Sequence, residues 1–328
     1  MQFQATLSEK EKVSRREVTR SGLADMTDTH CPICEERDDD KILYKERLPS
    51  NWLNPALYYS AREVRPGKHN TRFQIVKCRR CGLIRSNPIA PLDKISEAYR
   101  QSYVGYQDEM DNLKNTYGHY LMELSRFQPN KGRLLEIGCG SGFFLDGALD
   151  LGYRDVWGVE PSIEAKTHAS AKVHNKIISD FFRPGLFEDN SFDVICFFHV
   201  LDHLIDPNSF LNACNKILKP NGLILAIQHD VDAWSAKLLG KRSPIFDVIH
   251  IHLFNQETLR RIFEKNGFAT QETGGIRNIF SIRHCIKLSP LSGQTKKFVL
   301  RLLEATGIAN LNLRLKAGNL RIVARKLG

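Results

Sequence analysis

Leu134-Leu-Glu-Ile-Gly-Cys-Gly-Ser-Gly-Phe-Phe-Leu145 is the stretch that decides the fold of this chain. A short apolar run meets three glycines at alternate positions, and a second apolar pattern follows at helical spacing. This order predicts a strand, a tight turn and a helix. Because glycine has no Cβ, the turn can adopt positive φ and a ligand can approach its backbone closely. The three glycines are Gly138, Gly140 and Gly142.

Two acidic residues indicate which ligand this turn binds. Glu136 lies two residues before the first glycine, where a carboxylate would repel a pyrophosphate but suits a ligand with positive charge. S-adenosylmethionine (SAM) carries a sulfonium and an ammonium group. Glu160 ends the next apolar run, and an acid at that position accepts the ribose hydroxyls in other nucleoside-binding α/β folds. We therefore expect SAM as the cofactor.

Four stretches of the chain resemble the class I SAM-dependent methyltransferases. They are Leu135–Gly142, Gly158–Ser162, Phe192–His203 and Leu218–Gly222. The resemblance implies an α/β fold with a Rossmann-like seven-stranded sheet, a small N-terminal zinc-binding module and a helical insertion before the last strand. It also implies SAM contacts at Glu136, Gly138, Cys139, Gly140, Gly142, Glu160, Pro161, Asp180, Phe181, Phe198, His199 and Val200.

Several of these contacts have a specific role in the family. Asp180 matches the acid that holds the adenine amino group, and Phe181 matches the residue that packs on the adenine ring. Asp202-His203 stands where the family often has a Glu-His pair that shapes the cleft. Phe-Phe-His-Val at 197–200 differs from the Asn/Asp-Pro-Pro-Tyr/Phe motif of adenine methyltransferases, which argues against an adenine N6 target.

Alternating apolar runs predict a parallel sheet with helices on both faces. The expected strands are 133–137, 156–159, 176–179, 192–198, 223–228 and 268–273, with an antiparallel last strand at the sheet edge, 319–326. Expected helices include 113–127, 162–172 and 256–266. We divide the chain into an N-terminal arm (1–24), a zinc-binding module (25–95), a helical linker (96–130) and a methyltransferase domain (131–328) with a basic helical insertion (275–318).

Four cysteines form two C-x-x-C pairs, Cys31/Cys34 and Cys78/Cys81. Four thiolates favour a structural zinc ion. The second pair continues as C-G-L, which is similar to the zinc-binding module of methyltransferases from sugar and glycan pathways. The deoxysugar C-methyltransferases of that group carry a further large C-terminal domain, for which 328 residues leave no room. We therefore favour an oxygen acceptor over C-methylation.

His250 and His252 are the candidate catalytic residues. Related glycan-pathway methyltransferases have a histidine in this segment that faces the acceptor. Alternation places both side chains on one face of an extended segment, and an imidazole can take the proton of a hydroxyl acceptor. The alternative is that both histidines serve only the fold.

The net charge of +10 is concentrated near the C-terminus, where residues 281–328 carry ten Lys and Arg against one acid. This segment suits nucleic acid, anionic lipid or a phosphorylated substrate, or is a solvated basic face. Its amphipathic helix, 296–305, has three candidate roles: cover of the active site, pairing of subunits or peripheral contact with an anionic membrane. With no signal-like or membrane-spanning apolar run in the sequence, we expect a cytoplasmic protein.

These features predict a methyltransferase for a small-molecule or glycan-linked acceptor, with a sugar hydroxyl as the favoured target. An RNA methyltransferase is the second interpretation, although aromatic and basic residues are not interleaved in an RNA-binding pattern. A non-catalytic SAM-binding protein is the third. The sequence leaves the acceptor, the pathway and the oligomeric state open.

Overall fold

The computed structural model describes residues 26–37, 39–48, 71–100, 109–127, 131–289, 291–316 and 318–327. The expected N-terminal arm, 1–24, lies outside the described residues, and so does part of the expected linker. Among the helices of these ranges, none is long and apolar enough to cross a membrane.

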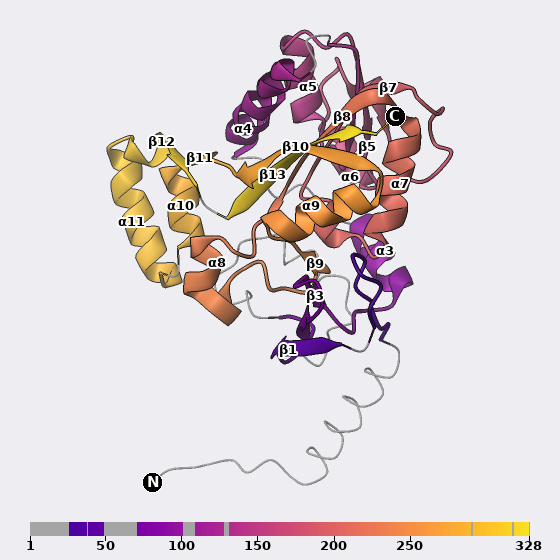
Figure 1. Ribbon diagram of the computed structural model, residues 1–328. Helices are drawn as coiled ribbons and strands as arrows, with labels where there is room; N and C mark the ends of the chain where they lie inside the picture. The colour runs from indigo at the N-terminus through magenta and orange to yellow at the C-terminus, as the bar shows by residue number, and fades with distance from the viewer. Residues whose placement is uncertain are drawn as a thin grey trace, which may run out of the picture.

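A seven-stranded sheet in the order β10-β13-β8-β7-β4-β5-β6 forms the centre of the molecule (Figure 1). Strands β8, β7, β4, β5 and β6 run parallel, whereas β13 is antiparallel to both β8 and β10. The expected fold class is therefore confirmed. The bounds are β4 (Arg133–Ile137), β5 (Asp155–Val159), β6 (Ile177–Ile178), β7 (Phe192–Phe198), β8 (Leu218–His229), β10 (Phe268–Gly275) and β13 (Asn319–Lys326).

One expectation about this sheet is wrong. The last strand, β13, does not lie at the edge but inserts between β8 and β10, and β10 forms the edge. Its burial explains this position, because Leu320 to Ala324 are buried as expected for a strand covered on both faces.

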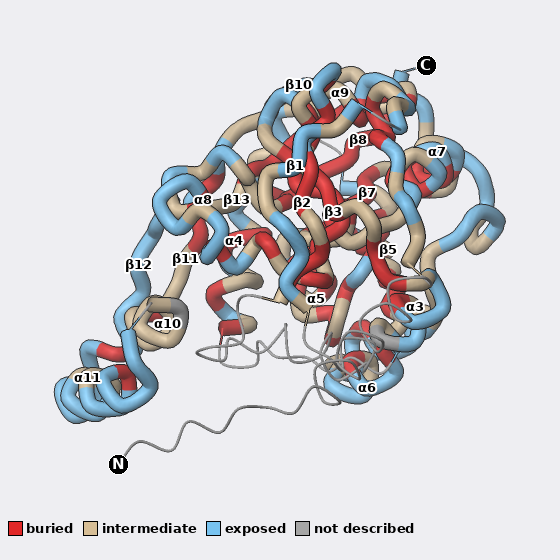
Figure 2. Tube along the Cα trace, turned by 90° about the horizontal axis from the view of Figure 1, so that it is seen from below, coloured by how far each residue is buried: buried red, intermediate tan, exposed pale blue. Residues whose placement is uncertain are grey.

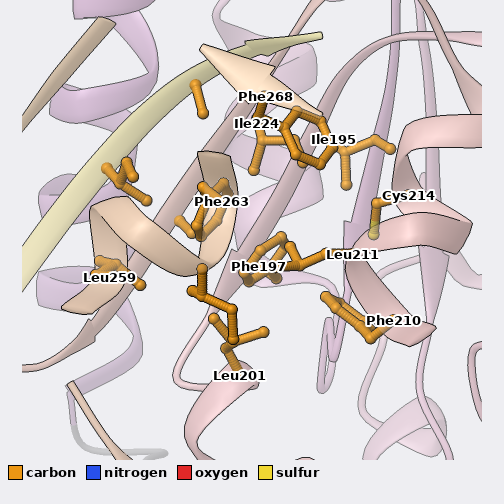
Figure 3. Close-up of a cluster of buried hydrophobic side chains, with 14 of the residues drawn as sticks. Ile195, Phe197, Leu201, Phe210, Leu211, Cys214, Ile224, Leu259, Phe263 and Phe268 are labelled. Atoms are coloured by element: carbon orange, nitrogen blue, oxygen red, sulfur yellow. The ribbon is translucent and has the colours of Figure 1, made fainter. Parts of the chain in front are cut away.

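Helices cover both faces of the sheet. Helices α4 (Met110–Glu123) and α5 (Phe143–Asp150) share one hydrophobic cluster with β7, and α7 (Pro207–Ile217) and α9 (Gln256–Lys265) share another. Successive β7 side chains alternate between the two clusters, since Phe197 packs with α7 and α9 whereas Phe198 packs with α4 and α5. Figure 3 shows Phe197 between Phe210 of α7 and Phe263 of α9.

Local sequence sets most helix ends. Asp206 accepts a hydrogen bond from the Ser209 N–H at the start of α7, and Asn255 forms a capping box with Thr258 at the start of α9. Such caps stabilise a helix by about 1 kcal/mol. Helix α6 (Ile163–Thr167) is shorter than the expected 162–172, and just beyond its end Ser170 donates instead to the Asp146 carboxylate at 2.7 Å.

The N-terminal module shares a sheet with the methyltransferase domain. Its strands β1 (Asp40–Tyr44), β2 (Ile75–Cys78) and β3 (Ile84–Ser86) pair in order, and β9 (His252–Leu253) adds to β3 as the fourth strand. Helix α3 (Leu92–Arg100) follows the module. The buried cysteines of the module belong to the same hydrophobic cluster as α7 and α9, so the two parts are packed as one body.

The expected insertion forms a separate projection beside α8 (Trp234–Leu239) (Figure 1). It contains β11 (Asn278–Ser281), α10 (Ile282–Leu288), α11 (Gly293–Ala305) and β12 (Asn312–Leu315). The expected basic helix corresponds to α11, which extends from the body and is largely exposed (Figure 2). Short 3₁₀ turns are η2 (Leu124–Arg126), η3 (His174–Lys176), η4 (Leu201–His203), η5 (Gly240–Arg242) and η6 (Ile308–Asn310).

Candidate functional site

The expected cofactor residues lie along one edge of the sheet, at the carboxyl ends of four adjacent strands. The glycine turn follows β4, Glu160 follows β5, Asp180 follows β6 and His199 follows β7. Ligands of open α/β sheets bind at this edge. The motifs follow β4, β5, β6 and β7 in the chain, and in the sheet they lie side by side in the order β7, β4, β5 and β6.

The glycine turn has the backbone shape that its sequence predicts. Gly138, Gly140 and Gly142 have φ angles of 76°, 55° and 74°, which lie in the region that favours glycine. A Cβ on Gly138 would lie 2.7 Å from the Val200 side chain, so these two expected contact residues pack against each other. A Cβ on Gly140 would meet no atom within 4 Å, which leaves open space on the side where a ligand can approach.

Glu160 and Glu136 place two acidic groups beside this turn. The Glu160 carboxylate accepts the N–H groups of Gly140 and Ser162, each at 2.9 Å, and so holds the turn to the end of β5. Glu136 is buried, and its Oε2 has no hydrogen-bond partner among the described residues. Burial, together with the nearby Glu160, raises the pKa of Glu136 well above its usual value. An unpaired buried carboxyl group suits a cationic ligand.

The remaining expected contacts fall into two groups. Asp180 and Phe181 are half-buried, and Asp180 Oδ1 accepts the Phe181 N–H at 2.7 Å. Pro161 is also half-buried beside Glu160. Phe198 instead stacks on Tyr117 with ring centroids 4.1 Å apart, and Cys139 is buried. The side chains of this second group belong to the core, which leaves their backbone atoms as the groups that a cofactor can contact.

A cluster of histidines lies beside the cofactor edge, at the ends of β7 and β8. His199 follows β7, His229 ends β8, and their rings are 4.3 Å apart. His250 packs on both His229 and His203, each with ring centroids 4.8 Å apart. The Asp202 carboxylate, 1% exposed, lies among them.

The imidazoles of this cluster differ in charge state. Burial and the nearby His250 charge lower the pKa of His199 to about 4. Burial acts on His250 in the same direction, but the carboxylates of Asp247 and Asp202 outweigh it and raise the His250 pKa to about 9. Burial, followed by His199 and His250, lowers the pKa of His229 well below its usual value. Neutral and charged rings therefore lie side by side.

His252 does not join this cluster, contrary to the expectation that it shares a face with His250. It lies in β9 opposite Arg85 of β3, and its Nδ1 is 3.0 Å from the Leu204 carbonyl oxygen. Between the two histidines, Ile251 N–H bonds to the Asp202 carbonyl oxygen, and Ile251 O accepts from Ser86 N–H. Burial lowers the pKa of His252 to about 3, as in a structural core histidine.

A family model described as a methyltransferase domain matches residues 107–273, which is half of the 328 residues. The chain belongs to this methyltransferase family. The expected class of enzyme is therefore confirmed at the level of the family, and with it the expected cofactor, SAM. The match begins near α4 and ends within β10, so it includes both the cofactor edge and the histidine cluster.

Two curated relatives are O-methyltransferases of ubiquinone biosynthesis. The methyltransferase from Nitrobacter winogradskyi is 32% identical over 158 residues, which are 44% of this chain and 59% of that protein. The one from Pasteurella multocida is 31% identical over 125 residues, which are 33% of this chain and 51% of that protein. This methyltransferase therefore spans about half the length of the curated relatives it matches.

Solved structures of similar fold include two SAM-dependent methyltransferases. The one from Archaeoglobus fulgidus has a TM-score of 0.45 and 17% identity, and the comparison covers 67% of this chain and 98% of that chain. The one from Aquifex aeolicus has a TM-score of 0.43 and 12% identity, with 66% and 93% covered.

The four cysteines of the two C-x-x-C pairs come together, with all four sulfur atoms within 4.8 Å of one another. Cys31 Sγ is 3.2 Å from Cys81 Sγ, and Cys34 Sγ is 3.4 Å from Cys78 Sγ. These separations exceed the roughly 2.05 Å of a disulfide bond. They come close to the sulfur spacing of a tetrahedral zinc ion with Zn–S bonds of about 2.3 Å, so the residues fit zinc.

Sequence reasoning missed four members of the histidine cluster. His229 and Asp247 were not singled out, and Asp202 and His203 were assigned only to the shape of the cleft. The available signal was that two neighbouring buried strands, β7 and β8, are each followed or ended by a histidine. Parallel neighbours bring such residues to one edge of the sheet.

Gly140→Ala tests the cofactor edge, with Gly185→Ala as its matched control. Both glycines have positive φ and open space where an added Cβ would lie, so each substitution should cost about 1–2 kcal/mol of backbone strain. Only Gly140 lies in the turn that we assign to SAM. We expect isothermal titration calorimetry to show at least tenfold weaker SAM binding for Gly140→Ala and unchanged binding for Gly185→Ala. Equal affinities would contradict the assignment.

Proposed function

We propose that this protein transfers the methyl group of SAM to a hydroxyl oxygen of its acceptor. The observation that carries the proposal is the histidine cluster, which lies at the ends of β7 and β8 directly beside the glycine turn of β4. A hydroxyl is a poor nucleophile until it loses its proton, and imidazoles are the usual acceptors of that proton near neutral pH. The names of the curated relatives, O-methyltransferases, point in the same direction.

The order of the expected SAM contacts along the sheet edge supports a reaction in which the acceptor oxygen displaces the sulfur atom from the methyl group. Asp180 and Phe181 would bind adenine beyond β6, Glu160 the ribose, and the glycine turn with Glu136 the methionine part. The sulfonium methyl would then face the ends of β7 and β8. The acceptor oxygen forms a bond to the methyl carbon as the carbon–sulfur bond breaks, and S-adenosylhomocysteine leaves. Alignment of this kind supplies about 7 kcal/mol or more in favourable cases.

We assign the role of general base, which accepts the proton of the acceptor hydroxyl, to His229 rather than to His250 or His252, the two candidates from the sequence. Asn319 Oδ1 lies 3.2 Å from His229 Nδ1, while the Asn319 amide nitrogen faces His199 Nε2 and Asn278 Oδ1. This arrangement puts the His229 proton on Nδ1 and leaves its Nε2 lone pair free to accept another. The His229 side chain is also 27% exposed, compared with 7% for His250.

A sugar hydroxyl is our first proposal for the acceptor, because the four-cysteine module is similar to that of sugar-pathway methyltransferases. A hollow of about 440 Å³ between the module and residues after α8 supports an acceptor with negative charge, since five of its six lining residues are basic. They are Lys45, Arg47, Arg72, Lys241 and Arg242, with Glu46. A nucleotide-linked or lipid-phosphate-linked sugar has that charge. An acceptor of ubiquinone biosynthesis, as in the names of the relatives, is the second candidate.

We propose zinc for the four-cysteine site, where a closed set of thiolates would serve the structure of the module. Cys31 and Cys81 share a hydrophobic cluster with α7 and α9. Loss of the ion should therefore loosen both the module and its packing on the methyltransferase domain.

Transfer of label from methyl-labelled SAM into a fractionated cell extract tests the proposed reaction. We expect label in the glycan or small-molecule fraction, and none with Glu160→Ala, because Glu160 holds the glycine turn and would bind the ribose. Label in RNA would instead favour an RNA methyltransferase and assign a binding role to the basic C-terminal segment. SAM binding without any transfer would favour a non-catalytic protein.

His229→Ala should lower kcat by about 100-fold or more, the usual contribution of a general base, while the Kd for SAM stays within a factor of two or so. His168→Ala is the control, because His168 is an exposed histidine outside the cluster. Steady-state kinetics and calorimetry on the same preparations give both values. Full activity of His229→Ala would remove His229 as the base.

Zinc removal gives a separate prediction. Chelation should lower Tm by several degrees, and Cys31→Ser should do the same because a thiolate ligand is lost. Cys285→Ser, which changes a half-buried cysteine outside the set, should leave Tm nearly unchanged. Thermal unfolding with a parallel zinc assay measures both effects. A chelated, zinc-free protein with unaltered Tm and activity would exclude the structural role.

A further inference from the structure

The projection formed by β11, α10, α11 and β12 exposes a large share of the apolar side chains at the surface of this protein. Of the fifteen exposed large hydrophobic side chains in the described residues, seven lie between residues 291 and 315. Single exposed apolar side chains are ordinary, but a cluster of them marks a surface that binds something. The question is what this surface binds.

Helix α11 carries apolar and basic side chains in two adjacent rows. Phe298 and Leu302, one helical turn apart, are 64% and 56% exposed. Lys297 and Arg301 precede them in the sequence, and they too lie one turn apart and are exposed. The helix packs on α10 and η6, so these four side chains form the part of its surface that its own fold leaves uncovered. We call them the outer face of α11.

The strand β12 adds apolar surface to the same projection. Leu311, Leu313 and Leu315 recur at every second residue and are all exposed. Side chains with this spacing share one face of an extended segment. Among the described strands β12 pairs only with β11, so its apolar face gains no cover from a further strand of the described chain.

The projection is also strongly basic. Residues 281–316 contain seven Lys and Arg against one acid, Glu304, which gives a net charge of +6. Glu304 pairs with Arg283, so no acid within the projection neutralises Lys297 or Arg301. A negatively charged surface with an apolar layer beneath it would complement both the charge and the exposed apolar side chains.

We propose that the outer face of α11 binds the surface of a membrane that contains anionic lipid. Phe298 and Leu302 enter the boundary between headgroups and acyl chains, while Lys297 and Arg301 contact headgroup phosphates. Helices with this combination of an apolar face and flanking basic residues lie in the plane of a membrane. Each basic side chain near an anionic surface strengthens binding roughly fivefold.

Other roles fit this face less well. A second copy in a symmetric dimer would bring two identical faces together, and their like charges would repel each other. Proteins that bind single-stranded nucleic acid stack aromatic side chains on the bases, whereas Phe298 is the single aromatic residue between residues 291 and 315. A cover over the cofactor edge is disfavoured because α11 extends away from the body (Figure 2).

The base of the projection is joined to α4 beside the cofactor edge. Glu109 accepts hydrogen bonds from the N–H and the hydroxyl of Ser281. The next residue, Met110, has its sulfur atom 3.4 Å from the hydroxyl oxygen of Ser141 in the glycine turn. Membrane binding by α11 therefore brings the cofactor edge to the lipid surface. This inference does not rest on the proposed methyl transfer.

Co-sedimentation of the full-length protein with lipid vesicles tests the proposal. The vesicles contain phosphatidylcholine alone or phosphatidylcholine mixed with the anionic lipid phosphatidylglycerol. We expect at least tenfold stronger binding to the mixed vesicles. Phe298→Ser/Leu302→Ser and Lys297→Glu/Arg301→Glu should each weaken that binding at least tenfold, because the first removes the apolar contact and the second reverses the charge.

Two double variants outside the projection are the matched controls. Ile42→Ser/Met122→Ser changes two exposed apolar side chains, and Lys41→Glu/Lys172→Glu reverses two exposed lysines. Both should bind the mixed vesicles as the wild type does. Isothermal titration calorimetry with SAM checks that each variant is folded, since none of these residues belongs to the cofactor edge. If the apolar variant of α11 fails to fold, the charge reversal carries the test.

Three results would overturn the proposal. The first is absence of binding to the mixed vesicles, or equal binding by a folded variant of α11. The second is a dimer in analytical ultracentrifugation that the α11 variants dissociate, without vesicle binding, which would assign this face to a second copy. The third is RNA binding that only the charge reversal removes, again without vesicle binding, which would assign it to nucleic acid.

Discussion

Hydrogen bonds on both sides of residues 249–253 join the two halves of this molecule. On one side Ile251 O accepts from Ser86 N–H and the His250 carbonyl accepts from the Ser86 hydroxyl, at 2.8 and 2.9 Å. On the other side Ile251 N–H donates to the Asp202 carbonyl oxygen at 2.7 Å. A buried backbone segment must satisfy these groups. The N-terminal module therefore positions His250 beside Asp202, although none of its described residues contributes a side chain to the histidine cluster.

Along the sheet edge, carboxyl groups and imidazoles follow different strands. Unpaired or backbone-bonded carboxyl groups, Glu136 and Glu160, lie at β4 and β5. Imidazoles lie at β7 and β8, and basic side chains line the hollow between the module and the residues after α8. The carboxyl groups at β4 and β5 suit a cationic cofactor such as SAM at that part of the edge.

Much of the sheet could be predicted because buried parallel strands appear as apolar runs, as in Phe192–Phe198. The cofactor turn could also be predicted, because its glycines occur together with Glu136, Glu160 and the downstream motifs. The pairing of strands that lie far apart in the sequence could not be predicted. Neither the position of β13 between β8 and β10 nor the addition of β9 to the module sheet leaves a local signal. His252 was misplaced for this reason, because its orientation depends on the partner strand β3.

The histidine cluster shows the same limit. His199 was found by its place after β7, but the family role assigned to it concerned the cofactor, and the proximity of His229 and Asp247 depends on tertiary packing. Which residues hold charge could not be predicted either, because burial and neighbouring carboxylates set the pKa values.

A crystal structure with S-adenosylhomocysteine tests the central claim most directly. The account predicts adenine beside Asp180 and Phe181, ribose hydroxyls at Glu160, and the sulfur atom over the ends of β4 and β7, turned towards His229. A sulfur atom turned away from the histidine cluster, or a ligand bound away from the glycine turn, would contradict it.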